Sequence, residues 1–246
     1  MPAPRGEGAG LSAWGRPVRR VVEHPLAPAD RGVWPAGVPA VRHLLDHGLD
    51  LGDATVIVGA NGAGKSTIVE AVAEAFGLNA EGGTRDVRHE TRRTTSDLAG
   101  HLLLERGAGA PKGGVFLRAE SMYGLFTYLE GVRPGGSLHE RSHGEAFLQF
   151  CRERSGVRGL WMLDEPESAL SFDSCLTLLV HLREALESGS QVILSTHSPV
   201  LAALPGARIL LLDEDGITET AYDDLPLVQH HRRFLDSPER YLRHLG

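Results

Sequence analysis

The segment G-A-N-G-A-G-K-S-T at residues 59–67 lies between two runs of different character. Before it, A-T-V-I-V at residues 54–58 is short, apolar and β-branched, which is typical of a buried strand. After it, residues 68–76 carry apolar side chains at helical spacing. The sequence therefore predicts a strand, a glycine-rich loop and a helix in direct succession.

The glycine-rich loop has the residues that a polyphosphate-binding loop requires. Its glycines let the backbone turn tightly and bring N–H groups close to phosphate oxygens, and the helix that starts near Lys65 directs its positive dipole end at the same charge. Lys65 supplies a positive charge for the β- and γ-phosphates, and the Ser66 hydroxyl is placed to ligate Mg²⁺. A glycine-rich turn without a ligand is the alternative, but it does not account for the full G-x-x-x-x-G-K-S pattern. The predicted nucleotide-binding residues are Gly59, Asn61, Gly62, Ala63, Gly64, Lys65, Ser66 and Thr67.

Composition places the chain among ordinary cellular globular proteins. With 246 residues it can form one large α/β domain around a substantial core. The two cysteines, Cys151 and Cys175, have neither disulfide-framework nor metal-ligand spacing, which indicates buried thiols in a reducing compartment. The N-terminus lacks the apolar core of a signal peptide, and no apolar run reaches the roughly eighteen residues of a membrane span. We expect a cytoplasmic protein with no direct membrane insertion.

The net charge of -7 argues against a surface built to coat nucleic acid. A local basic groove is still compatible with that total. Its candidate residues are Arg85, Arg88, Arg92, Arg93 and Lys112. A solvated face of an exposed β element is the alternative for the same residues.

Domain organisation is read from composition and periodicity. Residues 1–17 are rich in Gly, Pro and Ala and are expected to be a flexible leader, and residues 18–246 are expected to form one domain. The expected strands cover residues 19–23, 54–58, 98–105, 114–118, 160–163, 191–195, 208–212 and 217–222. The expected helices cover residues 38–47, 68–76, 121–130, 145–153, 173–187, 200–204 and 225–245, the last with a break near Pro238.

The order of these elements predicts the fold class. From Gly144 onward strands alternate with helices, which predicts an α/β fold with a mostly parallel sheet and helices on both faces. The middle of the chain predicts an antiparallel β element with a hairpin near residues 107–114.

A second motif, L-W-M-L-D-E-P at residues 160–166, is an apolar strand that ends in two carboxylates. Asp164 at the strand tip is suited to hold Mg²⁺ through its water shell. The adjacent Glu165 is the candidate general base, because it can polarise the water that attacks the γ-phosphate. A strand end capped by solvated acids is the alternative, which the upstream phosphate loop disfavours.

A third motif, S-T-H-S-P at residues 195–199, follows the next strand. A single histidine is more often a surface residue than a catalytic one. At a strand tip of an open α/β sheet, however, a neutral His197 lies on the ligand-binding edge and can contact the γ-phosphate.

The order of glycine loop, L-x-L-D-E-P, S-x-A-L and S-T-H-S-P resembles the ABC-type ATPases, a family of P-loop NTPases that includes transporter motor subunits and the heads of chromosome-maintenance and DNA-repair ATPases. The similarity extends from about residue 56 to residue 212. Within the family the chain is similar to a compact group of bacterial AAA-family or ABC-like ATPases. The resemblance implies ATP hydrolysis with ATP and Mg²⁺ as cofactors.

R-S-H-G-E at residues 141–145 resembles the family signature L-S-G-G-Q, which begins a helix and contacts the γ-phosphate held by the opposite subunit. Ser142 and Gly144 match the signature, whereas His143 and Glu145 depart from it. The resemblance therefore implies an ATP-dependent homodimer in which these four residues act in trans. The loop at Ser168–Leu170 resembles the segment that crosses the dimer interface.

Glu120 stands where the family usually has a glutamine that touches Mg²⁺ and the attacking water. A carboxylate can also ligate Mg²⁺, so the resemblance leaves catalysis intact but puts transporter-style coupling in doubt. About twenty residues separate Glu120 from Ser142, which implies a reduced helical lobe at about 121–155. Trp34 is a candidate for stacking on adenine, or a packing residue among prolines.

Three classes of function stay open for the chain. The first is a soluble ATPase switch or motor, which the reduced lobe favours. The second is the ATP-binding motor subunit of a membrane transporter. The third is a nucleotide-dependent scaffold without hydrolysis, against which Glu165 argues. The sequence does not name a protein partner.

Overall fold

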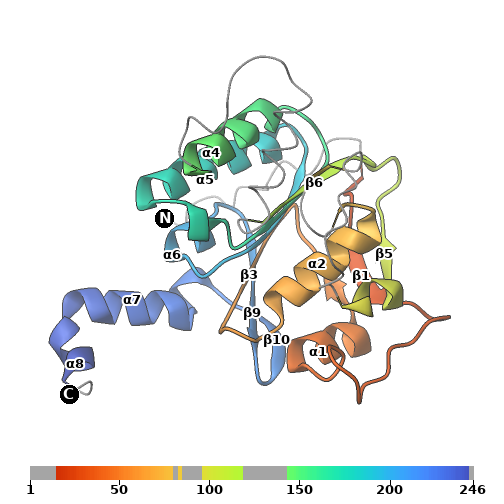
Figure 1. The fold of residues 1–246 in the computed structure, drawn as a ribbon, viewed down its shortest axis with the longest axis horizontal. Helices are drawn as coiled ribbons and strands as arrows, with labels where there is room; N and C mark the ends of the chain where they lie inside the picture. Colours follow the sequence, from red (N-terminus) through yellow and green to blue (C-terminus); the bar gives the residue numbers. More distant parts are fainter. Residues whose placement is uncertain (1–14, 80–82, 85–95, 119–142, 244–246) are drawn as a thin grey trace, which may run out of the picture.

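The computed structural model describes residues 15–79, 83–84, 96–118 and 143–243, and the prediction of a helix at 121–130 lies outside them. In these residues the main sheet has seven strands in the order β10-β9-β3-β8-β7-β6-β4 (Figure 1). The parallel strands are β3 (Ala54–Gly59), β6 (Gly114–Arg118), β7 (Leu160–Asp164), β8 (Gln191–Ser195) and β9 (Arg208–Asp213). Two antiparallel strands border them, β10 (Gly216–Glu219) beside β9 and β4 (Gly83–Thr84) beside β6. The mostly parallel α/β sheet is therefore confirmed.

Helices cover both faces of this sheet, as predicted (Figure 1). One face packs on α1 (Pro39–His47) and α2 (Lys65–Phe76). The other face packs on α4 (His143–Arg154), α5 (Phe172–Glu187), α6 (Pro199–Ala202) and α7 (Pro226–Asp236). Side chains of β7 alternate between the two cores, with Met162 in the first and Trp161 and Leu163 in the second. Because both faces are covered, the central strands are almost continuously apolar.

In the described residues, a smaller sheet of three antiparallel strands corresponds to the antiparallel β element predicted for the middle of the chain. Its order is β2-β1-β5, with β2 (Leu49–Asp50), β1 (Arg20–Glu23) and β5 (Leu102–Glu105) paired antiparallel. The strand expected at 98–105 begins only at Leu102, because residues 97–101 form the 3-10 helix η1 (Asp97–His101), which buries Leu98 in the core. The hairpin expected near 107–114 is wrong, since β5 pairs with β1 and β6 pairs with β7 in the other sheet.

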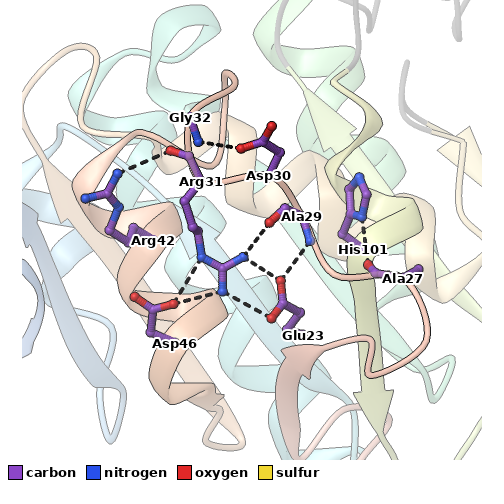
Figure 2. A network of polar contacts seen from close by, with 9 residues as sticks. All are labelled: Glu23, Ala27, Ala29, Asp30, Arg31, Gly32, Arg42, Asp46 and His101. Atoms are coloured by element: carbon purple, nitrogen blue, oxygen red, sulfur yellow. Dashed lines mark hydrogen bonds and ion pairs between the residues drawn. The ribbon is translucent and has the colours of Figure 1, made fainter.

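Arg31 holds the loop between β1 and α1 (Figure 2). Its Nη1 lies 2.5 Å from Glu23 Oε1 on β1, and its Nη2 lies 2.8 Å from Asp46 Oδ1 on α1. The hydrogen bond from Arg31 lowers the pKa of Glu23 below its ordinary value. The same loop ends at Val38, whose side chain approaches Gly64 in the phosphate loop. The network thus anchors a segment that supports the nucleotide site.

The chain ends in two helices and begins in a segment that is mostly outside the described residues. After α7, the short helix α8 (Pro238–Leu242) follows the break expected near Pro238. Of the expected leader, residues 1–14 are not described, and the Gly15 N–H donates to the Ala108 carbonyl at 3.1 Å. Within the part of the chain that is described, no helix has the length and apolar character to cross a membrane.

Candidate active site

The phosphate loop connects β3 to α2 through two glycines in left-handed conformation. Gly62 has φ +80° and Gly64 has φ +96°, which other residues adopt only with strain. A Cβ on Gly64 would also lie 3.1 Å from the Val38 side chain, so the close packing beneath the loop requires glycine. At the start of the loop, a Cβ on Gly59 would lie 2.5 Å from the Leu212 carbonyl. Side chains are therefore excluded by close contacts at Gly59 and Gly64, whereas a Cβ on Gly62 would meet nothing within 4 Å and that glycine is favoured by its backbone conformation alone.

The remaining predicted residues of the loop follow these glycines. Asn61 is exposed, Ala63 is half-buried, and Ser66 and Thr67 lie half-buried in the first turn of α2. Lys65, the first residue of that helix, has its side chain only 4% exposed. The positive end of the α2 dipole and the Lys65 ammonium thus occupy the same end of the helix.

Three motifs that lie far apart in the sequence meet at the Lys65 ammonium. Its Nζ donates to the Ala60 carbonyl at 3.2 Å and lies 2.8 Å from His197 Nε2 and 3.5 Å from Glu165 Oε1. His197 Nε2 is 3.2 Å from the same Glu165 oxygen. The structure therefore brings together the phosphate-loop lysine, the candidate general base and the candidate γ-phosphate contact.

Asp164 lies beside this group, at the end of β7, and is buried. Its Oδ1 accepts hydrogen bonds from the hydroxyls of Ser66, at 3.1 Å, and Ser195, and its Oδ2 lies 3.5 Å from Arg118 Nε. Burial raises the pKa of Asp164, although these hydrogen bonds and the Arg118 charge act in the opposite direction. Carboxylate and hydroxyl oxygens are the ligands that Mg²⁺ prefers, so this set of donors fits the metal.

Glu165 adopts a backbone conformation that favours glycine. Its φ of 47° and ψ of 50° make it the one non-glycine residue with positive φ among those the structure describes. Such a conformation costs about 1–2 kcal/mol for an ordinary side chain. The turn takes the Glu165 side chain out of the strand and toward Lys65. Strain at a candidate catalytic residue is a pattern often found at functional sites.

The sequence did not single out three residues that the structure places at this site. Ser195 lies opposite Asp164 in the β7–β8 register, Arg118 ends the neighbouring strand β6, and Glu167 accepts a hydrogen bond from the His197 backbone N–H. Each follows or ends a strand of the parallel sheet. Their proximity depends on the strand order, which a single sequence does not reveal.

The residues assigned from the family resemblance are only partly described. Glu120 and Ser142 lie outside the described residues, and of His143 only the backbone at the start of α4 is described. Gly144 packs against the loop at 168–170, since a Cβ there would lie 3.0 Å from the Ala169 carbonyl. Glu145 is exposed in the first turn of α4. The roles of these residues stay predictions.

Two further predictions from the sequence concern the adenine-stacking candidate Trp34 and the basic groove. Trp34 lies in the loop held by Arg31 and is 62% exposed, so it is not a core packing residue. The arginines at 85, 88, 92 and 93 lie outside the described residues, so the basic-groove prediction is not tested.

Comparison with curated proteins gives relatives that are named as ATP-binding proteins. No protein-family model matches the chain. The hemin import ATP-binding protein HmuV of Rhodopseudomonas palustris (strain BisB5) is 27% identical over 209 residues, which cover 74% of this chain and 79% of that protein. The cytochrome c biogenesis ATP-binding export protein CcmA of Paramagnetospirillum magneticum (strain ATCC 700264 / AMB-1) is 29% identical over 197 residues, which cover 71% and 88%.

A search of solved structures adds the SMC head domain from Thermotoga maritima. It is 15% identical, with 71% of this chain and 93% of that chain covered and a TM-score of 0.44.

Proposed function

We propose that the chain is an ABC-type P-loop ATPase and that it hydrolyses Mg²⁺-ATP between the phosphate loop of one copy and the α4 N-terminus of a second copy. The observation that carries this proposal is the convergence of Lys65, Glu165 and His197 within 3.5 Å of one another. A site that only binds nucleotide does not require a carboxylate and an imidazole next to the lysine of its phosphate loop, whereas a site that hydrolyses ATP does.

The proposed chemistry follows from the partners that ATP would replace. The Lys65 ammonium contacts Glu165 and His197. The γ-phosphate carries more negative charge than one carboxylate and would take over the ammonium. Glu165 is then free to orient a water molecule and accept its proton, while Lys65 and His197 stabilise the charge on the transferring phosphoryl group. Phosphoryl transfer of this kind depends mainly on positioning and electrostatics.

Ser66 and Asp164 would hold the magnesium ion in this proposal, because their oxygens already lie together beside the phosphate loop. The ion, when bound, would neutralise charge on the β- and γ-phosphate oxygens. Arg118, whose Nε lies 3.5 Å from Asp164 Oδ2, offsets part of the Asp164 charge. Glu120, which lies outside the described residues, is proposed as a further ligand on the strength of the family resemblance.

A second copy would complete the site through Ser142 and Gly144. The position of Gly144 against Ala169 supports this proposal, because it places the start of α4 beside the loop expected to cross the interface. ATP would then join two copies, and hydrolysis would separate them.

Two biological roles are candidates for this cycle of ATP binding and hydrolysis. The short segment between Glu120 and Ser142 favours a free-standing switch or motor. The printed names of the relatives, a hemin import and a cytochrome c export ATP-binding protein, favour a motor subunit that docks on a membrane permease. We place the free-standing switch first, because the same short segment leaves little chain for a transporter-type helical lobe.

The decisive experiment uses Glu165→Gln, which should bind ATP and hydrolyse it very slowly. With saturating ATP and Mg²⁺ we expect this variant to elute as a dimer on gel filtration and wild type to return to monomer as phosphate is released. The matched control, Lys65→Ala, should stay monomeric. A Glu165→Gln protein that binds ATP but elutes as a monomer would contradict the shared site.

The same trapped variant separates the two roles. Capture of partners with ATP-bound Glu165→Gln, with and without nuclease treatment, should recover the physiological partner. Co-fractionation with a membrane permease would overturn the free-standing switch, whereas nuclease-sensitive partners would support it.

A further inference from the structure

Glu167 connects the ends of the two strands that carry Glu165 and His197. It lies in the 3-10 helix η4 (Pro166–Ala169), and its Oε1 accepts a hydrogen bond from the backbone N–H of His197. A second link runs parallel to it, from the Glu165 N–H to the Ser195 carbonyl at 3.1 Å. Together these bonds fix the exit of β8 against the exit of β7.

The choice of a carboxylate at this position is costly for the fold. Glu167 Oε2 is buried and has no hydrogen-bond partner, a condition it shares with only one other side-chain atom in the described residues, Arg20 Nε. A buried polar atom that has lost its water without gaining a hydrogen bond destabilises a protein unless something offsets the cost. The Glu167 charge also acts inside the protein, because it adds to burial in raising the pKa of Cys175. A neutral acceptor or a water molecule would satisfy one loop N–H at lower cost, so stability alone does not account for Glu167.

The position of His197 depends on that backbone bond. Its Nε2 lies 2.8 Å from Lys65 Nζ and 3.2 Å from Glu165 Oε1, and a small displacement of the loop would break both contacts. Errors of about 1 Å in the placement of a catalytic group can reduce rates by about 100-fold.

We propose that Glu167 is a positioning residue that holds the His197 backbone and so sets the imidazole against Lys65 and the γ-phosphate. The inference rests on the proposed role of His197 in hydrolysis. Glu167 also accepts through its backbone carbonyl from the Leu170 N–H at 3.1 Å, so it joins the His197 loop to the segment expected to cross the dimer interface.

The test compares Glu167→Ala with Glu167→Gln in steady-state ATP hydrolysis by the full chain. The alanine variant loses the acceptor, whereas the glutamine variant keeps a carbonyl oxygen at the same place. We expect Glu167→Ala to lower kcat by about 10-fold or more with KM changed by less than about 3-fold. Glu167→Gln should recover most of the wild-type kcat. A glutamine variant as slow as the alanine variant, or an alanine variant with wild-type kcat, would overturn the inference.

A double-mutant comparison asks whether Glu167 acts through His197. If it does, Glu167→Ala should add little to the loss already caused by His197→Ala, because coupled residues are not additive. Losses that multiply would overturn the inference. If His197→Ala alone keeps wild-type kcat, the proposed role of His197 fails; if His197→Ala is slow but Glu167→Ala is not, only the positioning role fails.

Thermal denaturation of each variant separates positioning from folding. Because the carboxylate is costly to bury, the melting temperature of Glu167→Gln should equal or exceed that of wild type. Glu214→Gln, in the exposed turn between β9 and β10, is the control for the loss of one negative charge and should leave both kcat and the melting temperature unchanged. A glutamine variant that is unstable and slow would assign Glu167 to the fold and overturn the inference.

Discussion

The Lys65 ammonium lies 2.8 Å from His197 Nε2 and 3.5 Å from Glu165 Oε1, and these two partners lie 3.2 Å from each other. An ammonium carries only donors, so Lys65 can donate to the ring nitrogen and to the carboxylate but accept from neither. The three side chains are therefore in mutual contact around one positive charge. ATP must replace these contacts, which makes Lys65 the residue on which binding depends.

Lys65→Ala should weaken ATP binding by at least about 10-fold, since a hydrogen bond to a charged group contributes about 1.5–3 kcal/mol. The measurement is calorimetric titration with ATP and Mg²⁺. Lys65→Arg keeps the charge but presents a planar guanidinium, so it should bind with intermediate affinity. If the ATP affinity of the alanine variant stays within 2-fold of the wild-type affinity, the assignment of a phosphate-binding loop is contradicted.

Asp164→Asn should stabilise the nucleotide-free protein and abolish Mg²⁺-dependent hydrolysis. Burial raises the pKa of Asp164 above its ordinary value of 3.8, so the folded protein takes up a proton more readily than the unfolded chain. That contribution to stability is complete below the ordinary value and is lost as pH rises through the raised pKa. At neutral pH the charged carboxylate is therefore unfavourable, and asparagine removes the charge while keeping an acceptor for Ser66 and Ser195.

Thermal scans of both proteins in chelator check this prediction. We expect a melting temperature about 2–4 °C higher for Asp164→Asn near neutral pH, as for a change of about 1 kcal/mol in a chain of this size. The difference should shrink as the pH approaches 4. A variant less stable than wild type at neutral pH would show that the Asp164 charge is well compensated.

The local unit of β3, phosphate loop and α2 was predictable from the sequence because its signals are all local. Alternation of buried strands with helices likewise identified β7, α5 and β8. The segment at residues 97–101 was not predictable, because D-L-A-G-H has a single large apolar side chain, Leu98, and so no periodicity that separates a strand from a 3-10 turn.

The contacts of the site were less accessible to sequence reasoning. Asp164 and Ser195 touch because β7 and β8 are neighbours in parallel register, and strand order is a property of the whole sheet. The absence of a hairpin between β5 and β6 has the same cause, since each strand finds its partner far along the chain.

Glycine at position 64 should be harder to replace than glycine at position 206. Both have positive φ, but a Cβ on Gly64 would meet Val38 at 3.1 Å, whereas a Cβ on Gly206 would meet nothing within 4 Å. Gly206→Ala should cost about 1 kcal/mol from backbone strain alone. Gly64→Ala should cost more than that and also weaken ATP binding. Urea denaturation of the two variants checks the order, which equal losses would contradict.

Removal of the Glu23 charge should destabilise the protein in a pH-dependent way. Because Arg31 lowers the pKa of Glu23, the carboxylate contributes stability above its ordinary value of 4.5, and this is lost as pH falls through the lowered pKa. Glu23→Gln should therefore cost about 1 kcal/mol near neutral pH and almost nothing near pH 3 in urea denaturation. Glu219→Gln, whose partner Arg208 forms an exposed pair, is the control and should cost little at either pH. Equal losses for both variants would contradict the prediction.

Glu165 gives the last prediction, because its backbone strain and its catalytic role can be separated. With φ at 47°, residue 165 pays for a left-handed conformation that glycine adopts freely. Glu165→Gly and Glu165→Ala both remove the carboxylate and should both be inactive. The glycine variant should nevertheless be more stable than the alanine variant by about 1 kcal/mol, since relief of strain exceeds the entropy that glycine costs. Urea denaturation measures this difference. An alanine variant that is more stable than the glycine variant would contradict this prediction. It would show that the left-handed conformation at position 165 causes no backbone strain.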